Sequence, residues 1–159
     1  GMSFILIDRI DVLEAGVRAA GVKCVALSDP VFVDHFPEHP IFPGSLLIEA
    51  MAQLGGCLAE ASYHAEQPDT RRALLIQADR AKFHQPVRPG DQLGVECRVA
   101  SLLGHAVQIE AQVSSVRGEV AQAVLNFRLM TVDSPTLHQS RRALYRQWLA
   151  HWERPPELR

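Results

Sequence analysis

The chain has 159 residues, which is enough for one domain with a substantial core and few for two. Hydrophobic residues make up 47% of it and charged residues 21%, a globular balance that argues against disorder. The net charge is -2, so the chain lacks the excess of basic residues that is typical of a dedicated nucleic-acid-binding protein. Three widely spaced cysteines without a CxxC motif indicate reduced thiols in a cytoplasmic protein, not a disulfide framework or a zinc site.

The first part of the chain predicts a β-hairpin followed by an ordered loop. Residues 4–15 and 16–27 are β-rich and meet at a turn-like Ala-Gly pair, which favours two paired strands. The stretch 35–43 contains three prolines, which remove backbone donors and fix φ. Because such a stretch can be neither regular helix nor central strand, we expect a loop there.

A long apolar segment follows this loop. Pro43-Gly44 suits a first helical turn, because proline lacks only an N–H that has no partner there. Apolar side chains then cover every face of the helix, so we expect the rest of the molecule to enclose it. The run 45–59 contains Glu49 and Gln53 and is too short to cross a bilayer, so a soluble protein is expected. Polar residues predict that the helix ends between residues 60 and 69.

Four further β-like segments are separated by short connections: 73–83, 91–103, 105–116 and 119–130. The connections between the last three are too short for a crossover helix, so these segments are expected to be antiparallel. Together with the hairpin they give about six strands for one apolar helix. This combination predicts an α+β domain over residues 2–134, with the sheet wrapped around the helix.

Residues 135–159 predict a separate C-terminal helical extension. Tyr145, Trp148, Leu149 and Trp152 lie at positions i, i+3, i+4 and i+7, which form one stripe on a helix. We expect this stripe to pack on the sheet or on a partner subunit. A basic membrane-surface helix is the alternative, but it would be short because two prolines follow at once.

The strongest candidate for chemistry is a carboxyl group inside the apolar helix. An unpaired buried carboxylate is costly, so Glu49 is expected to be paired or neutral, and a neutral carboxyl group can act as a general acid. His35 can supply the matching base, if the loop folds back over the helix or if the two residues meet across a dimer interface. Gly44 and Ser45 contribute N–H groups at the helix N-terminus, where the dipole favours an oxyanion.

Each of these residues also has an ordinary structural interpretation. Glu49 can be a structural hydrogen-bonding residue, and His35 an ordinary loop histidine. His35 and His39 would suit a metal only on a helix, which the prolines exclude, and no Cys or Asp cluster completes a site. We therefore expect no metal. Gln53, one turn after Glu49, can orient the carboxyl group or simply satisfy its own amide.

The string HFPEHPIFPGSLLIEAMAQ resembles the signature of the FabZ-type (3R)-hydroxyacyl-acyl carrier protein dehydratases, with a histidine and a glutamate fourteen residues apart. FILIDRIDVLEAG resembles the opening strand of that family, and DRAKFHQPVRPGDQL resembles its segment after the helix. The likeness covers roughly residues 4–130. It implies the hotdog fold, in which an antiparallel sheet wraps around a long central helix.

The resemblance implies a role for each candidate residue. His35 would remove the proton alpha to the thioester, and Glu49 would protonate the departing 3-hydroxyl group. The N–H of Gly44, with Ser45 beside it, would hold the thioester oxygen, and Gln53 would support the acid. The base and the acid would meet across a homodimer, which could assemble further into a trimer of dimers. The related FabA dehydratase-isomerases have aspartate in place of the glutamate, so dehydration without isomerisation is favoured.

The resemblance also implies a carrier for the substrate, the phosphopantetheine of acyl carrier protein or coenzyme A, and no metal or redox cofactor. Opposite charge steers protein encounters, so basic residues are candidate docking sites for an acidic carrier protein: Arg71, Arg72, Arg80, Lys82 and Arg88. The ordinary alternative for each of these residues is that it lies on the surface in contact with solvent and binds no partner. Two other functions stay open, a hotdog acyl thioesterase and a non-catalytic assembly subunit, although the intact pair of His35 and Glu49 argues against both.

Overall fold

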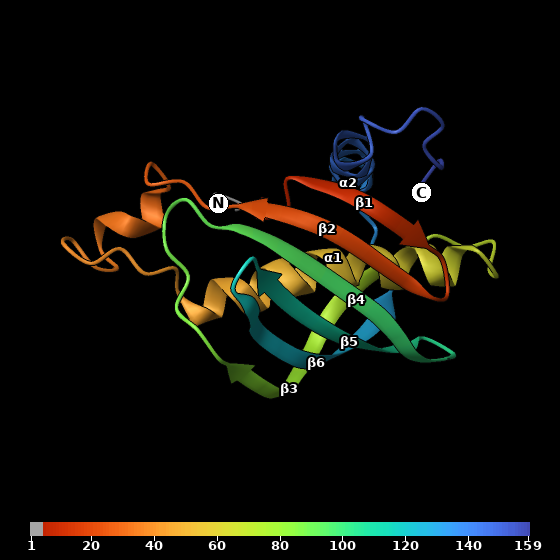
Figure 1. The fold of residues 1–159 in the computed structure, drawn as a ribbon. Coiled ribbons are helices and arrows are strands. Elements are labelled where there is room, and N and C mark those ends of the chain that lie inside the picture. Colours follow the sequence, from red (N-terminus) through yellow and green to blue (C-terminus); the bar gives the residue numbers. More distant parts are fainter. Residues whose placement is uncertain (1–4) are drawn as a thin grey trace.

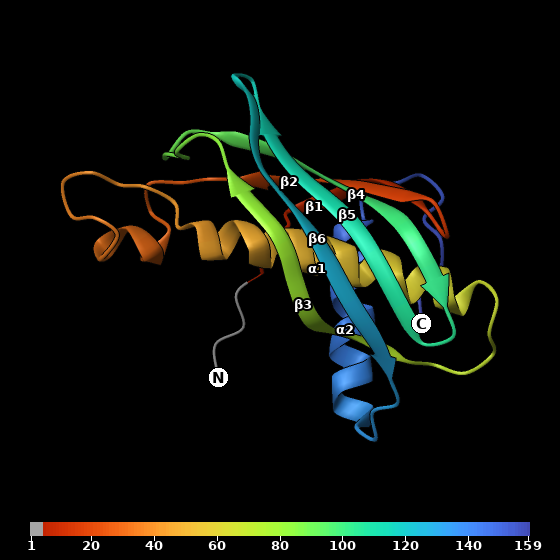
Figure 2. The ribbon, with the colours of Figure 1, turned by 90° about the horizontal axis from the view of Figure 1, so that it is seen from below.

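The computed structural model of the protein describes residues 5–159 and shows an antiparallel sheet wrapped around a long helix (Figures 1 and 2). The six strands are β1 (Arg9–Glu14), β2 (Arg18–Cys24), β3 (Arg72–Phe83), β4 (Gln92–Leu103), β5 (Ala106–Ser115) and β6 (Gly118–Met130). The α-helices are α1 (Gly44–His64) and α2 (Pro135–Trp148), and a short 3-10 helix, η1, covers Pro30–Val33. The predicted α+β class is confirmed.

The strand order in the sheet is β1-β2-β4-β5-β6-β3, with every neighbouring pair antiparallel. β1 and β2 form the predicted hairpin through a turn in which Gly16 has a φ of +78°. Residue 4, where the first predicted strand opens, lies outside the described residues. β4, β5 and β6 form the predicted antiparallel run. β3 pairs with β6 instead of its sequence neighbour β4, so β1 and β3 are the two edges of the sheet.

α1 begins at Gly44, as predicted, and ends at His64, within the predicted interval. All its residues from Leu54 to Tyr63 are buried. The N-terminal half is less covered, because Ser45 and Glu49 are exposed and Gln53 is only half-buried. The expectation that the protein encloses the helix on all sides is therefore right only for the C-terminal half, and one face of the N-terminal half is open.

α2 covers part of α1 and of the β1 edge. Figure 1 shows α2 beside β1, and Figure 2 shows it lying across α1. Tyr145, Trp148 and Leu149 are buried, so the predicted apolar stripe packs on its own chain. The helix ends at Trp148, and Trp152 therefore comes from the turn after it, from where its indole N–H donates to Ile10 O at 2.7 Å. None of the helices in residues 5–159 is long and apolar enough to span a membrane.

Candidate active site

The loop before α1 holds His35 by two hydrogen bonds to the same residue. Nδ1 of its ring lies 2.8 Å from Ile41 O, and the Ile41 N–H donates to His35 O at 3.0 Å. Because a carbonyl oxygen can only accept, Nδ1 must carry the proton, and Nε2 of the neutral ring is the basic atom. The ring stacks on Phe36 with a centroid distance of 4.3 Å. The loop thus presents an imidazole whose tautomer suits a general base.

The first turn of α1 lies against the ring of Phe83, at the end of β3. Pro43 is the N-cap and makes no side-chain hydrogen bond, so no cap side chain occupies the helix N-terminus. A Cβ atom at Gly44 would lie 2.9 Å from Phe83 Cε1, which is closer than ordinary packing allows. Glycine therefore lets the Phe83 ring approach the first turn of α1, whose N–H groups carry the positive end of the helix dipole. This arrangement can hold an anionic oxygen.

Glu49 and Gln53 lie one turn apart on the open face of α1. The Gln53 Nε2 group donates to Glu49 Oε1 at 3.3 Å, and Gln53 Oε1 accepts from the Leu6 N–H at 2.9 Å. The predicted support of the acid by Gln53 is therefore geometrically available. Glu49 itself is exposed, so its own chain does not provide the burial expected from the sequence.

The base and the acid are not joined within the protomer. No hydrogen bond or ion pair in the described part of the chain links His35 to Glu49. Of the two routes that the sequence leaves open, folding of the loop onto its own helix thus gives no direct contact. The other route that the sequence leaves open is contact across a dimer interface.

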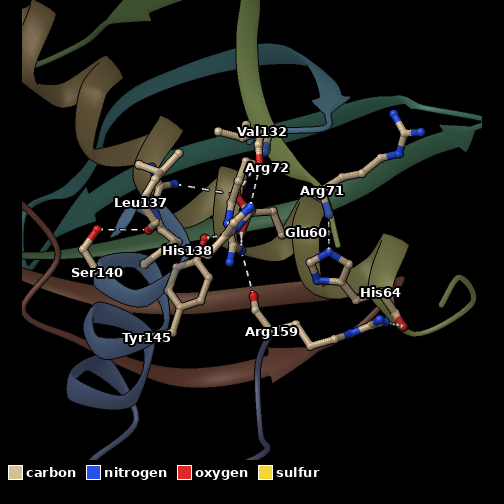
Figure 3. A network of polar contacts seen from close by, with 12 residues as sticks. Glu60, His64, Arg71, Arg72, Val132, Leu137, His138, Ser140, Tyr145 and Arg159 are labelled. Atoms are coloured by element: carbon tan, nitrogen blue, oxygen red, sulfur yellow. Dashed lines mark hydrogen bonds and ion pairs between the residues drawn. The ribbon is translucent and has the colours of Figure 1, made fainter. Parts of the chain in front are cut away.

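The buried carboxylate of α1 is Glu60, which sequence reasoning missed (Figure 3). Its side chain is 1% exposed, and Oε1 accepts from Arg72 Nη1 and from the Tyr145 hydroxyl, each at 2.7 Å. Arg141 of α2 adds an ion pair at 3.6 Å. Burial, and then the charge of Glu60, raises the pKa of Tyr145 well above its usual value. The spacing of eleven residues places Glu60 on the same helical face as the exposed Glu49, so it gave no local signal that Glu60 is buried.

The network in Figure 3 also holds the C-terminal segment. Arg72 donates to His138 Nδ1 at 3.1 Å and to Arg159 O at 2.7 Å. The Arg159 guanidinium donates to carbonyl groups at and beyond the end of α1, including Gln67 O at 2.7 Å. His64 lies beside these cations, and burial together with Arg159 and Arg72 lowers its pKa to about 4.

The five basic residues proposed for carrier docking are not equivalent in the structure. Arg72 is 3% exposed and bound to Glu60, so the expectation that it lies on a docking surface is wrong. Arg71 is half-buried, and its ion pair with Asp69 at 2.8 Å raises the pKa of Arg71. The remaining three are exposed: Arg80 and Lys82 on β3, and Arg88 in the β3–β4 connection.

Arg80 and Lys82 lie where β3 departs from regular pairing. The register with β6 shifts between Asp79 and Lys82, and Arg80 has a φ of +51°. Both line a depression on the sheet face opposite α1, together with Arg18 and Arg98. Within residues 5–159 we find no group of three or more His, Cys, Asp or Glu side chains placed to hold a metal ion.

Comparison with known proteins identifies related sequences. Residues 1–123 match the family model of the FabA-like domain, and α2 lies outside the match. The 3-hydroxyacyl-[acyl-carrier-protein] dehydratase FabZ of Sulfurovum sp. (strain NBC37-1) is 43% identical over 133 residues, which cover 82% of this chain and 88% of that protein. The protein of the same name from Halalkalibacterium halodurans is 39% identical and covers 79% of this chain and 88% of its own length.

Solved structures confirm the hotdog fold. The dehydratase heterocomplex ApeI:P from Xenorhabdus doucetiae matches with a TM-score of 0.65 at 14% identity, covering 86% of this chain and 89% of that one. A hot-dog-like protein from Thermanaerovibrio acidaminovorans matches with a TM-score of 0.61 at 18% identity, covering 89% and 96%. Identities this low show a common fold and no more.

Proposed function

The chain belongs to the FabA-like family, and on that premise we propose that it removes water from (3R)-3-hydroxyacyl thioesters to give trans-2-enoyl thioesters. The names of its FabZ relatives support an acyl-carrier-protein-linked substrate in fatty-acid or related lipid biosynthesis. The observation that carries the proposal is the 2.8 Å distance between His35 Nδ1 and Ile41 O, which favours the tautomer with Nε2 as the basic atom, on the stretch that also provides Glu49.

In this proposal the two side chains share the proton transfers. His35 Nε2 removes the proton from the carbon alpha to the thioester, and the released electron pair forms the double bond as the C3–O bond breaks. Protonated Glu49 gives its proton to the leaving hydroxyl group, which departs as water. Charge that develops on the thioester oxygen is held by the Gly44 N–H at the start of α1, with Ser45 beside it.

A homodimer would complete the site. The open face of α1 leaves Glu49 exposed, and β3 is an edge strand whose Leu74 and Ile76 are 53% and 57% exposed. An unpaired edge with exposed apolar side chains is suited to pairing with a second copy of the same chain. His35 of one protomer would then face the partner's Glu49. A trimer of dimers is the further assembly that we propose.

The substrate would arrive on a phosphopantetheine arm of acyl carrier protein or coenzyme A. Arg80, Lys82 and Arg88 are the exposed members of the proposed docking set, and their charge suits an acidic carrier. Acid and base are both protein side chains in this mechanism, so it uses no metal and no redox cofactor.

The test follows the ultraviolet absorbance of the conjugated enoyl thioester formed from a 3-hydroxyacyl carrier-protein substrate. The wild-type protein should form it, and His35→Ala and Glu49→Gln should each abolish formation. Thiol release from acyl-coenzyme A, measured in parallel, reports a thioesterase. Enoyl formation retained in both variants, or thiol release as the main activity, would overturn the proposal.

A further inference from the structure

Three hydrogen bonds, joined by the backbone of residues 6 and 7, connect α2 to Glu49. The Trp148 indole N–H donates to Ile7 O at 2.7 Å. The residue before it, Leu6, donates its backbone N–H to Gln53 Oε1 at 2.9 Å. Gln53 Nε2 then donates to Glu49 Oε1 at 3.3 Å. The C-terminal extension is thus connected to the candidate acid through two residues of the segment before β1.

The bond from Leu6 requires one orientation of the Gln53 amide. A carboxamide has one accepting oxygen and one donating nitrogen, and a backbone N–H can only donate. Leu6 therefore holds Oε1, and Nε2 is left on the side of Glu49. An amide turned the other way would place its oxygen against the carboxyl group and remove that donor.

The segment before β1 is packed tightly between α1 and α2. Leu6, Ile7 and Trp148 are 4%, 1% and 2% exposed. Water cannot readily replace a hydrogen bond at such a position, so loss of the indole N–H would leave Ile7 O buried without this donor. The backbone at residues 6 and 7 would shift to recover a partner.

We propose that Trp148 is a positioning residue for the dehydration. By fixing Leu6 and Ile7 it sets the Gln53 amide, and the amide orients the carboxyl group of Glu49. This inference rests on the proposed function of Glu49 as the acid. The family match ends at residue 123, so the extension adds a support to the site from outside the matched domain.

The test compares Trp148→Phe with Trp152→Phe. Trp152 is a matched control because its indole N–H also donates to a backbone carbonyl, Ile10 O at 2.7 Å, but at a residue that is not next to Leu6. Trp148→Phe should lower kcat about 10-fold, equivalent to ~1.4 kcal/mol, with KM within about 2-fold, and should shift the pH profile of kcat. Trp152→Phe should leave kcat and its pH profile unchanged. Both are assayed well below the lower melting temperature.

Two further measurements separate positioning from general damage. Replacement of Trp148 by 3-benzothienylalanine keeps the bicyclic shape and puts a sulfur atom, which cannot donate, in place of the N–H. It should reproduce the loss in kcat even if Trp148→Phe does not fold. In a Gln53→Met background, which has no amide to orient, Trp148→Phe should cause no further loss.

The outcomes are distinct. Equal losses for the two tryptophans, wild-type kcat in the benzothienyl variant, or additive losses with Gln53→Met would overturn the positioning role. A wild-type protein that forms no enoyl product would overturn the proposed function itself.

Discussion

Arg72 and Glu60 form a buried ion pair where β3, α1 and α2 meet. Arg72 Nη1 lies 2.7 Å from Glu60 Oε1, and the two side chains are 4% and 1% exposed. Tyr145 of α2 donates to the same carboxylate oxygen, and Arg72 also donates to His138 and Arg159. One carboxylate therefore ties the C-terminal extension to the helix that carries the candidate acid.

Loss of one partner from this pair should be strongly destabilising. Arg72→Met removes the nearer of two cations from the buried Glu60 and leaves only the longer ion pair with Arg141, and loss of one partner from a buried pair costs about 3–5 kcal/mol. Chemical denaturation should show this drop in the free energy of unfolding, with equal m-values for the wild type and the variant. Arg128→Met is the control, because Arg128 is exposed on β6. Its change should stay within about 0.5 kcal/mol. An Arg72 variant as stable as this control would show that the pair contributes nothing net.

Stability should fall in mildly acidic solution because of His64. Burial, and then the charges of Arg159 and Arg72, lower its pKa from 6.5 to about 4. The folded state therefore binds this proton only at a lower pH than the unfolded chain does. Between pH 4 and 6.5 the unfolded state therefore binds more protons than the folded state. The contribution of the neutral His64 ring to the free energy of unfolding is complete above pH 6.5 and is lost as the pH falls toward 4. Because the ring is only partly buried, we expect a loss of about 1–2 kcal/mol.

His64→Gln isolates this contribution. A glutamine oxygen can still accept the Arg71 N–H, which His64 Nε2 accepts at 3.0 Å, but it does not titrate. Free energies of unfolding measured at pH 7 and pH 4.5 should differ less in the variant than in the wild type. Equal pH dependence in both proteins would contradict the assignment to His64.

Carrier docking on β3 can be tested by charge reversal. Arg80→Glu with Lys82→Glu should raise KM for an acyl carrier protein substrate about 10-fold, because the steering attraction becomes repulsion. The same acyl group on coenzyme A is the control, and its KM should change less than about 3-fold if the charges act on the protein carrier. Both increases in KM should be smaller at high salt, because salt screens the charges. Equal effects on the two substrates would place these residues elsewhere in the reaction.

The sequence carried enough local signal to predict the hairpin, the start of α1 at Gly44, the antiparallel run of β4 to β6 and the C-terminal helix. These features depend on turn residues, on proline and on periodicity within short windows. The place of β3 beside β6 could not be predicted in this way, because it depends on pairing between strands that are not neighbours in the chain.

The candidate site shows the same limit. The loop around His35 and the pair of Glu49 and Gln53 follow from one continuous stretch, and they were found. Glu60 and Arg72 were misjudged as a polar helix end and a surface cation. Glu60 is bonded to Tyr145, more than eighty residues away in the chain, and Arg72 to His138 and Arg159. No local pattern reports such contacts. Glu49 was expected to be buried because the composition of α1 does not show which face is left open.

Alanine substitutions at Gly56 and Gly44 of α1 distinguish a glycine that is needed for activity from one that is not. At Gly56 an added Cβ would meet Phe127 and Ala73 at 3.7 and 3.9 Å, which is ordinary contact. Gly56→Ala should therefore gain about 0.5–1 kcal/mol from helix propensity and keep its activity. At Gly44 the added Cβ would lie 2.9 Å from Phe83 Cε1, on a ring that is 49% exposed and able to move.

Gly44→Ala should thus change the free energy of unfolding by less than about 1 kcal/mol, because the ring can turn away and alanine suits a helix. Its methyl group would nevertheless occupy the approach to the N–H that holds the thioester oxygen. Loss of one such donor costs about 100-fold or more in kcat, and we expect a decrease of at least about 10-fold here. Steady-state kinetics and denaturation on the two alanine variants make the comparison. Full activity in Gly44→Ala would remove this N–H from the mechanism.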